Sequence, residues 1–239
     1  MAKRPIFVPI NGYPFIQKRD VEFEWYPGFS KTQAQKSITS LHQAAKEQNN
    51  ITRILEISSK SPDPMGVALS AFNLVLQVDE SHSMSVECAF QGSKVFKSGG
   101  PFHDLYDGSS LQAKRDERLR NSGELISFNF PGEVFPNKPE TAFYDWLYLR
   151  ALMQHDDLVQ YVIQFEGFSD IAFNPKRSLN CQARSVALFV SLHNLGLLDQ
   201  VEDKESYLKL VSPTRDKQHR SDTDLSELQQ MFLFDSEKN

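Results

Sequence analysis

The sequence predicts an α+β protein, a predominantly helical single domain with a small sheet. Three observations support this fold class. The chain has 239 residues, which suits one domain with a large core. Apolar residues with helical spacing alternate with short strand-like segments, and Pro and Gly gather between them. No internal repeat or low-complexity tract interrupts this pattern, so an array of small modules is not expected.

Composition narrows the class of protein further. The formal net charge is -5, so nothing attracts the whole chain to nucleic acid or to an anionic membrane, and any nucleic-acid contact must be local. No apolar run reaches the roughly 20 residues of a membrane-spanning helix. Prolines interrupt the apolar N-terminal segment, which therefore does not resemble a signal peptide. With only 2 cysteines in no metal-ligand spacing, we expect a cytoplasmic protein without a disulfide framework.

The first quarter of the chain predicts a small sheet and a helix. Residues 6–10 and 21–25 alternate between apolar and polar side chains, which is typical of strands. Ser30 is the expected N-cap of a helix over residues 31–47, and residues 54–58 predict another strand. Residues 59–66 contain two prolines and a glycine, so we expect an irregular loop there.

The middle of the chain predicts three helices. Ser85 is the expected N-cap of the first, which should end at the Gly99-Gly100-Pro101 sequence. The charged residues 110–120 predict the second. After the apolar stretch 125–130, the aromatic residues 141–154 predict a mostly buried third helix.

The last third predicts a strand pair around residues 161–165 and 169–173, a turn at 174–177, and a final core helix from Ser178 to Gly196. Residues 221–234 place their apolar side chains on one helical face. We therefore expect a catalytic domain over residues 1–198. Residues 199–239 would form a charged extension whose amphipathic helix docks on that domain.

The segment SVECAFQGSK, residues 85–94, holds the most suggestive polar residues. In a helix, Glu87, Gln91 and Lys94 would lie on one stripe, so a carboxylate, an amide and an amine would point the same way. An ordinary surface helix is the alternative interpretation. The small residues around them would let a ligand approach the backbone closely.

Two further segments could contribute to a site. Ser58 to Ser61 follow a strand and offer hydroxyl groups together with the ammonium of Lys60, although the Gly spacing of a phosphate-binding P-loop is missing. Asn174 to Arg177 add two cations at the expected N-terminus of the last helix, where pyrophosphate is favoured. Either segment could equally be a solvated turn.

Other chemistries find little support. The 6 histidines are scattered, with neither HExxH nor a His/Cys cluster, so we expect no catalytic metal and no cofactor. No GxSxG sequence occurs. The aromatic cluster around Trp146 is mainly core, with stacking on a base as a minority interpretation.

Several motifs in order resemble one known family. LSAFNL, SVECAFQGSKVF and AKRD (residues 113–116) are similar to the NADAR family, also called YbiA-like N-glycosidases. The flanks PGFSKTQAQKSI, LEISSKS, FYDWLY and FSDIAFNPKRSLNCQARS resemble the NADAR antitoxins paired with DarT-type DNA ADP-ribosyltransferase toxins. The resemblance covers about residues 5–198. Broader YbiA relatives carry a tryptophan-glycine element near the C-terminus, which this chain lacks.

The resemblance implies removal of ADP-ribose from guanine bases of DNA, with ADP-ribosylated DNA, ADP-ribose and a DarT-type toxin as partners. Glu87 would stabilise an oxocarbenium-like state and activate water. Lys60, or alternatively Lys94, would form an imine with the opened ribose. Asp170 would be a second acid or base. The expected substrate contacts are Ser59, Phe72, Asn73, Gln91, Lys94, Trp146, Asn174, Lys176, Arg177 and Asn180.

Two other functions remain open at this point. A non-catalytic antitoxin would occlude its toxin through its surface or its tail. An N-glycosidase of the same fold could act instead on a small phosphorylated nucleotide or a flavin precursor. The oligomeric state is not indicated by the sequence.

Overall fold

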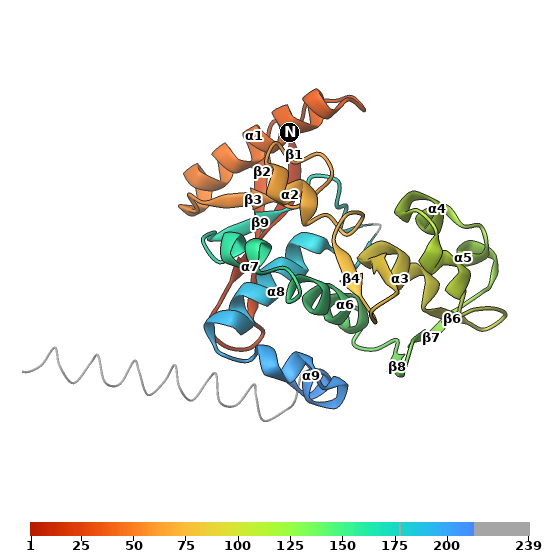
Figure 1. Ribbon diagram of the computed structural model, residues 1–239. Coiled ribbons are helices and arrows are strands. Elements are labelled where there is room, and N and C mark those ends of the chain that lie inside the picture. The colour runs from red at the N-terminus through yellow and green to blue at the C-terminus, as the bar shows by residue number, and fades with distance from the viewer. Residues whose placement is uncertain (177, 213–239) are drawn as a thin grey trace, which may run out of the picture.

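The N-terminal hairpin begins the largest sheet of the computed structural model, which describes residues 1–176 and 178–212 (Figure 1). Strands β1 (Ala2–Pro9) and β2 (Ile16–Phe23) pair antiparallel along their whole length. β1 also pairs antiparallel with β9 (Gly167–Ser169), and β9 pairs parallel with β3 (Ile54–Glu56). The strand order is β2-β1-β9-β3. The two predicted N-terminal strands are confirmed, and both begin earlier than expected.

Helices cover both faces of this sheet. Helix α1 (Lys31–Asn49) packs on one face, and its predicted cap is confirmed because the Ser30 side chain accepts from the Gln33 backbone N. Helix α8 (Gln182–Asn194) packs on the other face. Successive β1 side chains point in opposite directions, so Ile6 joins the small core under α1 and Phe7 the large core under α8.

The carboxyl ends of β3 and β9 determine where a site can form. Because the two strands are parallel, the chain leaves both at the same edge of the sheet. β1 runs antiparallel to β9, which brings the beginning of β1 to that edge as well. Residues 57–63, residues 170–176 with 178–181, and the first residues of the chain therefore meet there.

The segment after β3 corrects one prediction. Residues 59–66 are not irregular throughout, because helix α2 (Pro64–Ala68) begins within them. Asp63 caps α2 by accepting from the Met65 backbone N at 2.8 Å. Pro64 occupies the first turn, where a missing N–H costs nothing and the fixed φ favours the helix.

A second correction concerns the segment after Ser85. β4 (Val75–Gln77) and β5 (Ser83–Ser85) form a two-stranded sheet that leads into helix α3 (Val86–Gly92). The Ser85 cap is confirmed, since its hydroxyl accepts from the Cys88 backbone N at 3.1 Å. The helix ends at Gly92 and not at Gly99, because β6 (Lys94–Phe96) pairs with β7 (Leu125–Phe130). Lys94 is therefore the first residue of a strand.

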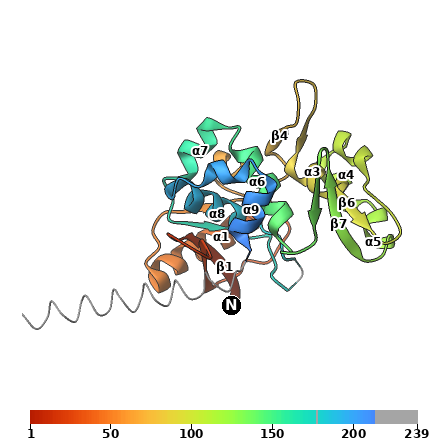
Figure 2. The same ribbon diagram turned by 90° about the horizontal axis from the view of Figure 1, so that it is seen from below.

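Residues 94–136 form a small lobe beside the main body (Figure 2). Its sheet has the order β6-β7-β8, with β8 spanning Glu133–Pro136. The expected helix over 110–120 is divided, after the short 3-10 helix His103–Asp107, into α4 (Ser110–Arg115) and α5 (Arg118–Asn121). The break lies at Asp116, whose carboxylate accepts from both the backbone and the guanidinium of Arg118.

The buried aromatic helix is confirmed as α6 (Ala142–Leu152), with Trp146 in the large core. The strand expected around 161–165 is wrong, because helix α7 (Asp156–Val162) occupies that region. The two aspartates in its first turn interact favourably with the positive N-terminal end of the helix dipole. Leu158 and Val162, four residues apart, both face the core.

The last core helix begins later than expected, because α8 starts at Gln182 after Cys181 and not at Ser178. Beyond it, the 3-10 helix Leu198–Val201 and helix α9 (Lys204–Val211) add Val201 and Tyr207 to the large core. A boundary at residue 198 stays a prediction, and the amphipathic segment 221–234 lies outside the described residues. Among the described residues, no helix is long and apolar enough to cross a membrane. The α+β class is confirmed.

Replacing Gly66 by Ala tests the packing between α2 and β3. Ala normally favours a helix by about 1 kcal/mol over Gly. Here its Cβ would lie 2.1 Å from the Glu56 carbonyl oxygen and 2.4 Å from the Ser61 Oγ, so overpacking outweighs that gain. We expect Gly66→Ala to lower the free energy of unfolding by about 1–3 kcal/mol in urea titrations.

Gly108→Ala is the matched control. A Cβ at Gly108 meets only ordinary contacts of 3.5 Å or more, so its stability should change by less than about 0.5 kcal/mol. Equal stability of the two variants would contradict the packing described for α2.

Candidate functional site

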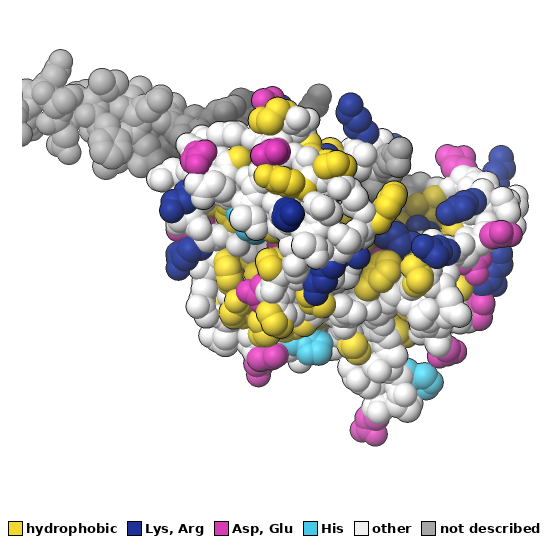
Figure 3. Space-filling model, turned by 90° about the horizontal axis from the view of Figure 1, so that it is seen from above, with side chains coloured by type: hydrophobic (Ala, Val, Ile, Leu, Met, Phe, Trp, Pro, Cys, Tyr) yellow, Lys and Arg dark blue, Asp and Glu magenta, His cyan; other side chains and the backbone are white. Residues whose placement is uncertain are grey.

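A cavity of about 1180 Å³ lies between the main body and the small lobe. It exceeds the range of about 300–1,000 Å³ that is common for small-molecule sites. Figure 3 looks onto this hollow, around which Lys and Arg side chains gather. Its walls come from the loops after β3 and β9, from α3, β6 and α4, and from the segment before α6. A ligand there would contact both parts of the molecule.

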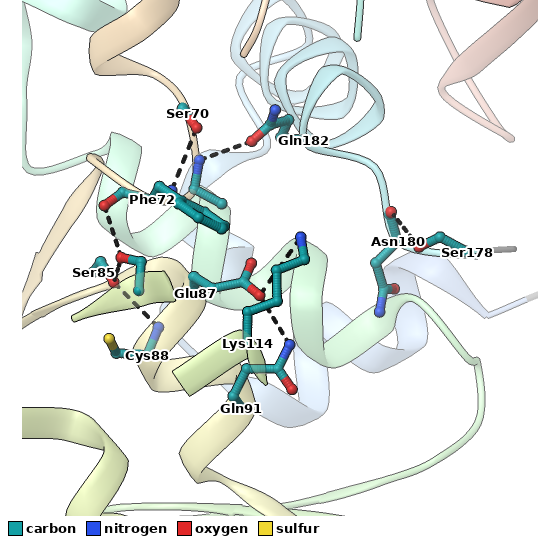
Figure 4. A network of polar contacts seen from close by, with 12 residues as sticks. Ser70, Phe72, Ser85, Glu87, Cys88, Gln91, Lys114, Ser178, Asn180 and Gln182 are labelled. Carbon is teal, nitrogen blue, oxygen red and sulfur yellow. Dashed lines mark hydrogen bonds and ion pairs between the residues drawn. The ribbon is translucent and has the colours of Figure 1, made fainter. Parts of the chain in front are cut away.

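Glu87 lies on the inner wall of the cavity, with 5% of its surface exposed. Its Oε1 accepts from the Gln91 amide at 2.9 Å, and Gln91 Oε1 accepts from Lys94 Nζ at 2.7 Å. Lys114 places its Nζ 3.9 Å from the same Glu87 oxygen (Figure 4). A buried carboxylate, an amide and two amines are thus linked in one network.

The environment of Lys94 makes its amine unusually easy to deprotonate. The pKa of Lys94 is lowered to about 8, mainly by burial; the Glu87 carboxylate opposes this shift and the Lys114 ammonium adds to it. The Nζ atom also lies 4.4 Å from the centre of the Phe90 ring. A neutral amine, which is the nucleophilic form, is therefore accessible at mildly alkaline pH.

Asp170 is a second buried carboxyl group on the cavity wall, 8% exposed. Its Oδ1 accepts from the backbone N atoms of Ala172 and Phe173 at 3.0 and 3.2 Å. Burial, together with the nearby Glu56 carboxylate, raises the pKa of Asp170 to about 7. Close to neutral pH this group can therefore donate or accept a proton.

Glu56, fully enclosed beneath the cavity, ties the two loops together. Its Oε1 accepts from the Ser58 hydroxyl at 2.7 Å and from the Ile171 backbone N at 2.8 Å, while Ser169 donates to Oε2. Ser169 also contacts His42 Nε2 at 2.8 Å. Burial raises the pKa of Glu56 and lowers the pKa of His42 to about 4, so this imidazole is neutral at pH 7.

Apolar surface completes the inner end of the cavity, from Phe72, Phe90, Phe128 and Tyr144. Lys114 lies over the Phe72 ring at 5.0 Å. Gln182 connects two of the surrounding segments, because its amide donates to the Ile57 carbonyl at 2.6 Å and accepts from the Ala71 backbone N at 2.8 Å. Flat aromatic faces beside charged groups are suited to a nucleotide-like ligand.

Most of the site residues expected from the sequence meet in this cavity. The lining residues among them are Ser59, Phe72, Glu87, Gln91, Lys94, Asp170, Asn174, Lys176 and Asn180. Three described candidates do not line it. Lys60 is half-buried in the turn after β3, the exposed Asn73 donates to the Val67 carbonyl, and Trp146 is a core residue that donates to the Val201 carbonyl. Arg177 lies outside the described residues.

The expected helix N-terminus for pyrophosphate is not at residues 174–177. Asn174 instead closes a turn by accepting from the Lys176 backbone N at 3.0 Å, and α8 begins only at Gln182. The two segments are separated by residues 178–181, so any anion contact of Asn174 and Lys176 depends on their side chains and on the turn.

Sequence reasoning missed several lining residues, notably Arg4, Trp25, Lys114, Tyr144 and Gln182. Lys114 had a signal, because it lies within the AKRD motif. Arg4 and Trp25 had none, since only the pairing of β1 with β9 brings them to this edge of the sheet. No group of three or more His, Cys, Asp or Glu side chains in residues 1–176 and 178–212 is arranged to hold a metal ion.

The raised pKa of Asp170 predicts a pH-dependent stability. The pKa of about 7 means that the folded protein holds this proton up to about pH 7, whereas an unfolded chain releases it near the ordinary pKa of 3.8. Between these values the native state binds more protons, so the stability due to Asp170 falls as pH rises. We therefore compare the free energy of unfolding of Asp170→Asn with that of the parent at two pH values. The difference in favour of the variant should increase by about 1–3 kcal/mol when the pH is raised from about 5 to about 8.5.

Denaturant titrations at the two pH values measure this gain, and the exposed Asp107→Asn is the control. A constant difference between parent and Asp170→Asn would contradict the buried, charge-opposed environment of Asp170.

Comparison with known proteins gives one finding on the family. No curated protein matched the chain. The family model of the DarT1-associated NADAR antitoxins matches residues 2–221, which is most of the chain and includes every described lining residue of the cavity. The resemblance seen in the sequence motifs is thereby confirmed. This chain belongs to the family of DarT1-associated NADAR antitoxins.

Proposed function

We propose that this protein hydrolyses the N-glycosidic bond between ADP-ribose and guanine bases of DNA, and so reverses the modification made by a DarT-type toxin. One observation supports the proposal most strongly. A buried carboxylate, Glu87, borders a cavity large enough for a nucleotide and is linked to an amide and two amines. The family assignment supplies the toxin partner and the antitoxin role to this proposal.

Glu87 has the chemistry for the central step. Cleavage at the ribose C1 passes through an oxocarbenium-like state, which a nearby carboxylate stabilises. Gln91 holds Oε1, whereas Oε2 makes no hydrogen bond to any of the described residues. Oε2 is therefore available to a ribose or to an attacking water, whose proton it would accept.

Asp170 suits the role of the acid. The guanine leaves with the electron pair of its bond to C1, so it needs a proton. A carboxyl group with a pKa of about 7 holds a proton in a large fraction of molecules at neutral pH.

The geometry also favours one of the two lysines considered for a covalent route. Lys94 lines the cavity and has a pKa of about 8, while Lys60 lies in the turn outside the lining. In this route the neutral Lys94 amine attacks C1, and guanine departs with the electron pair of its bond to C1. The bond between C1 and the ring oxygen then breaks, which gives an imine to Lys94 and a ribose hydroxyl group that takes the amine proton. Water then hydrolyses the imine.

Glu87→Gln tests the central role of the carboxylate. The substitution keeps the shape and the contact with Gln91 but removes the negative charge. We expect release of ADP-ribose from guanine-modified single-stranded DNA to fall by at least about 100-fold. The exposed Glu117→Gln is the matched control and should keep the parent rate.

A fully active Glu87→Gln would contradict the proposed mechanism. Coexpression with the toxin separates catalysis from binding. If Glu87→Gln still protects cells while a chain lacking residues 221–239 does not, the antitoxin acts by occluding its toxin.

Reduction with borohydride tests the lysine route. An imine to Lys94 would be reduced to a stable amine, which adds the sugar to one peptide that mass spectrometry identifies. Lys94→Arg should abolish this adduct because a guanidinium does not form the imine, whereas Lys60→Arg should retain it. An adduct on Lys60 would reverse the assignment, and an active enzyme without any adduct would favour direct attack by water.

A further inference from the structure

The outer end of the cavity contains two residues without a role in the chemistry above. Arg4 lies in β1, and Trp25 follows β2 by two residues. The Arg4 guanidinium lies 5.4 Å from the centre of the Trp25 ring. Trp25 packs edge-on against Phe23 with ring centroids 6.2 Å apart, yet remains 37% exposed. The guanidinium therefore lies over one face of the indole, and part of this cavity-lining ring stays exposed.

Two polar atoms of cavity-lining residues have no partner among the described residues. They are Arg4 Nε and Asn180 Oδ1, both shielded from solvent. A buried polar atom without a partner costs about 1–3 kcal/mol. Arg4 Nη1 donates to the Lys3 carbonyl at 3.0 Å, but this bond leaves Nε without an acceptor. A ligand that reoriented these side chains and paired their unpartnered atoms would recover this free energy. Figure 4 shows the Asn180 amide facing the side of the cavity that holds Lys114 and Gln91.

The charged and aromatic side chains at this end favour a ligand that combines an anionic group with an uncharged aromatic ring. Arg4 and Lys176 contribute positive charge here, and the Asp170 carboxyl group, whose pKa is raised to about 7, lies near Arg4. Burial lowers the pKa of Arg4, and Asp170 opposes that shift by raising it. A nucleotide phosphate matches the guanidinium, since charge-assisted contacts of this kind are strong and directional. A nucleobase matches the open indole face.

We propose that Arg4 and Trp25 form a nucleotide subsite, in which the indole stacks on a base and the guanidinium binds its phosphate. Asn180 donates to or accepts from the same ligand. This proposal rests on the proposed function and extends it, because the substrate offers two such nucleotides. One is the adenylate end of ADP-ribose, and the other is a DNA nucleotide adjacent to the modified guanine.

Tryptophan fluorescence gives a direct test, because the chain has only 2 tryptophans and Trp146 is 1% exposed. The full chain is titrated separately with AMP, ADP-ribose, ribose 5-phosphate and an unmodified single-stranded oligonucleotide. We expect a ligand with a base to quench Trp25, whereas ribose 5-phosphate should leave the emission unchanged. Quenching by AMP and ADP-ribose identifies the adenylate end, and quenching by the oligonucleotide alone identifies the adjacent DNA nucleotide.

Calorimetry with the quenching ligand then measures how much each residue contributes to the binding affinity. Trp25→Ala should weaken binding by roughly 5- to 150-fold, the range expected for one stacked base. Arg4→Gln should weaken binding of the phosphorylated ligand by about 10-fold or more, but not binding of the corresponding nucleoside. The controls are Phe29→Ala, which is fully exposed outside the cavity, and the exposed Arg19→Gln. Both controls should bind as the parent does.

The proposal is overturned if no ligand quenches Trp25, or if Trp25→Ala and Arg4→Gln bind like the parent while circular dichroism shows them folded. These outcomes are separate from those of the catalytic proposal, because binding of AMP needs no hydrolysis. An inactive protein that binds through Trp25 would contradict only the enzymatic function. An active protein whose binding is indifferent to both substitutions would contradict only the subsite.

Discussion

The buried carboxyl group of Glu56 is the constraint on which the cavity depends. It stands at the end of β3, and groups from the segments after β3 and around β9 converge on it. A buried carboxyl group is tolerated only when its oxygens are hydrogen-bonded, so Ser58, Ser169 and the Ile171 backbone must stay in place. The same bonds fix the starting points of both cavity-lining loops. The same side chain thus satisfies the hydrogen bonds of the core and fixes the positions of the two loops that line the cavity.

The consequences of this arrangement extend to Asp170. Two buried carboxyl groups close together cannot both ionise easily, so the proton affinity of Asp170 depends on Glu56 as well as on burial. The surroundings of Glu87 on the inner wall are different, because amines and an amide, and not a second carboxyl group, lie next to its carboxylate. One cavity therefore holds one carboxyl group that readily takes a proton and another beside positive charge. In the proposed reaction, Asp170 would be the acid and Glu87 the group that accepts the proton of water.

Local signals in the sequence were sufficient for the caps at Ser30 and Ser85, for the buried faces and for the fold class, but not for the cap expected at Ser178. Ser30 and Ser85 were recognised because capping depends on a few adjacent residues. The end of α3 was missed because Lys94 to Phe96 are drawn into a strand by β7, about thirty residues away. α7 was missed because its short apolar run suits either a strand or a helix. Arg4 and Trp25 could not be placed, since the pairing of β1 with β9 joins distant parts of the chain. The motif resemblance, and not spacing alone, identified Glu87 and Gln91.

The early end of α3 has a consequence for the network on the inner wall. Glu87 and Gln91 belong to the helix, but Lys94 begins the sheet of the small lobe. The ammonium that contacts Gln91 is therefore attached to a different structural unit from the carboxylate. The contact between Lys94 and Gln91 thus joins the sheet of the small lobe to the helix that carries the carboxylate, and the relative position of these two units sets where the amine stands in the cavity.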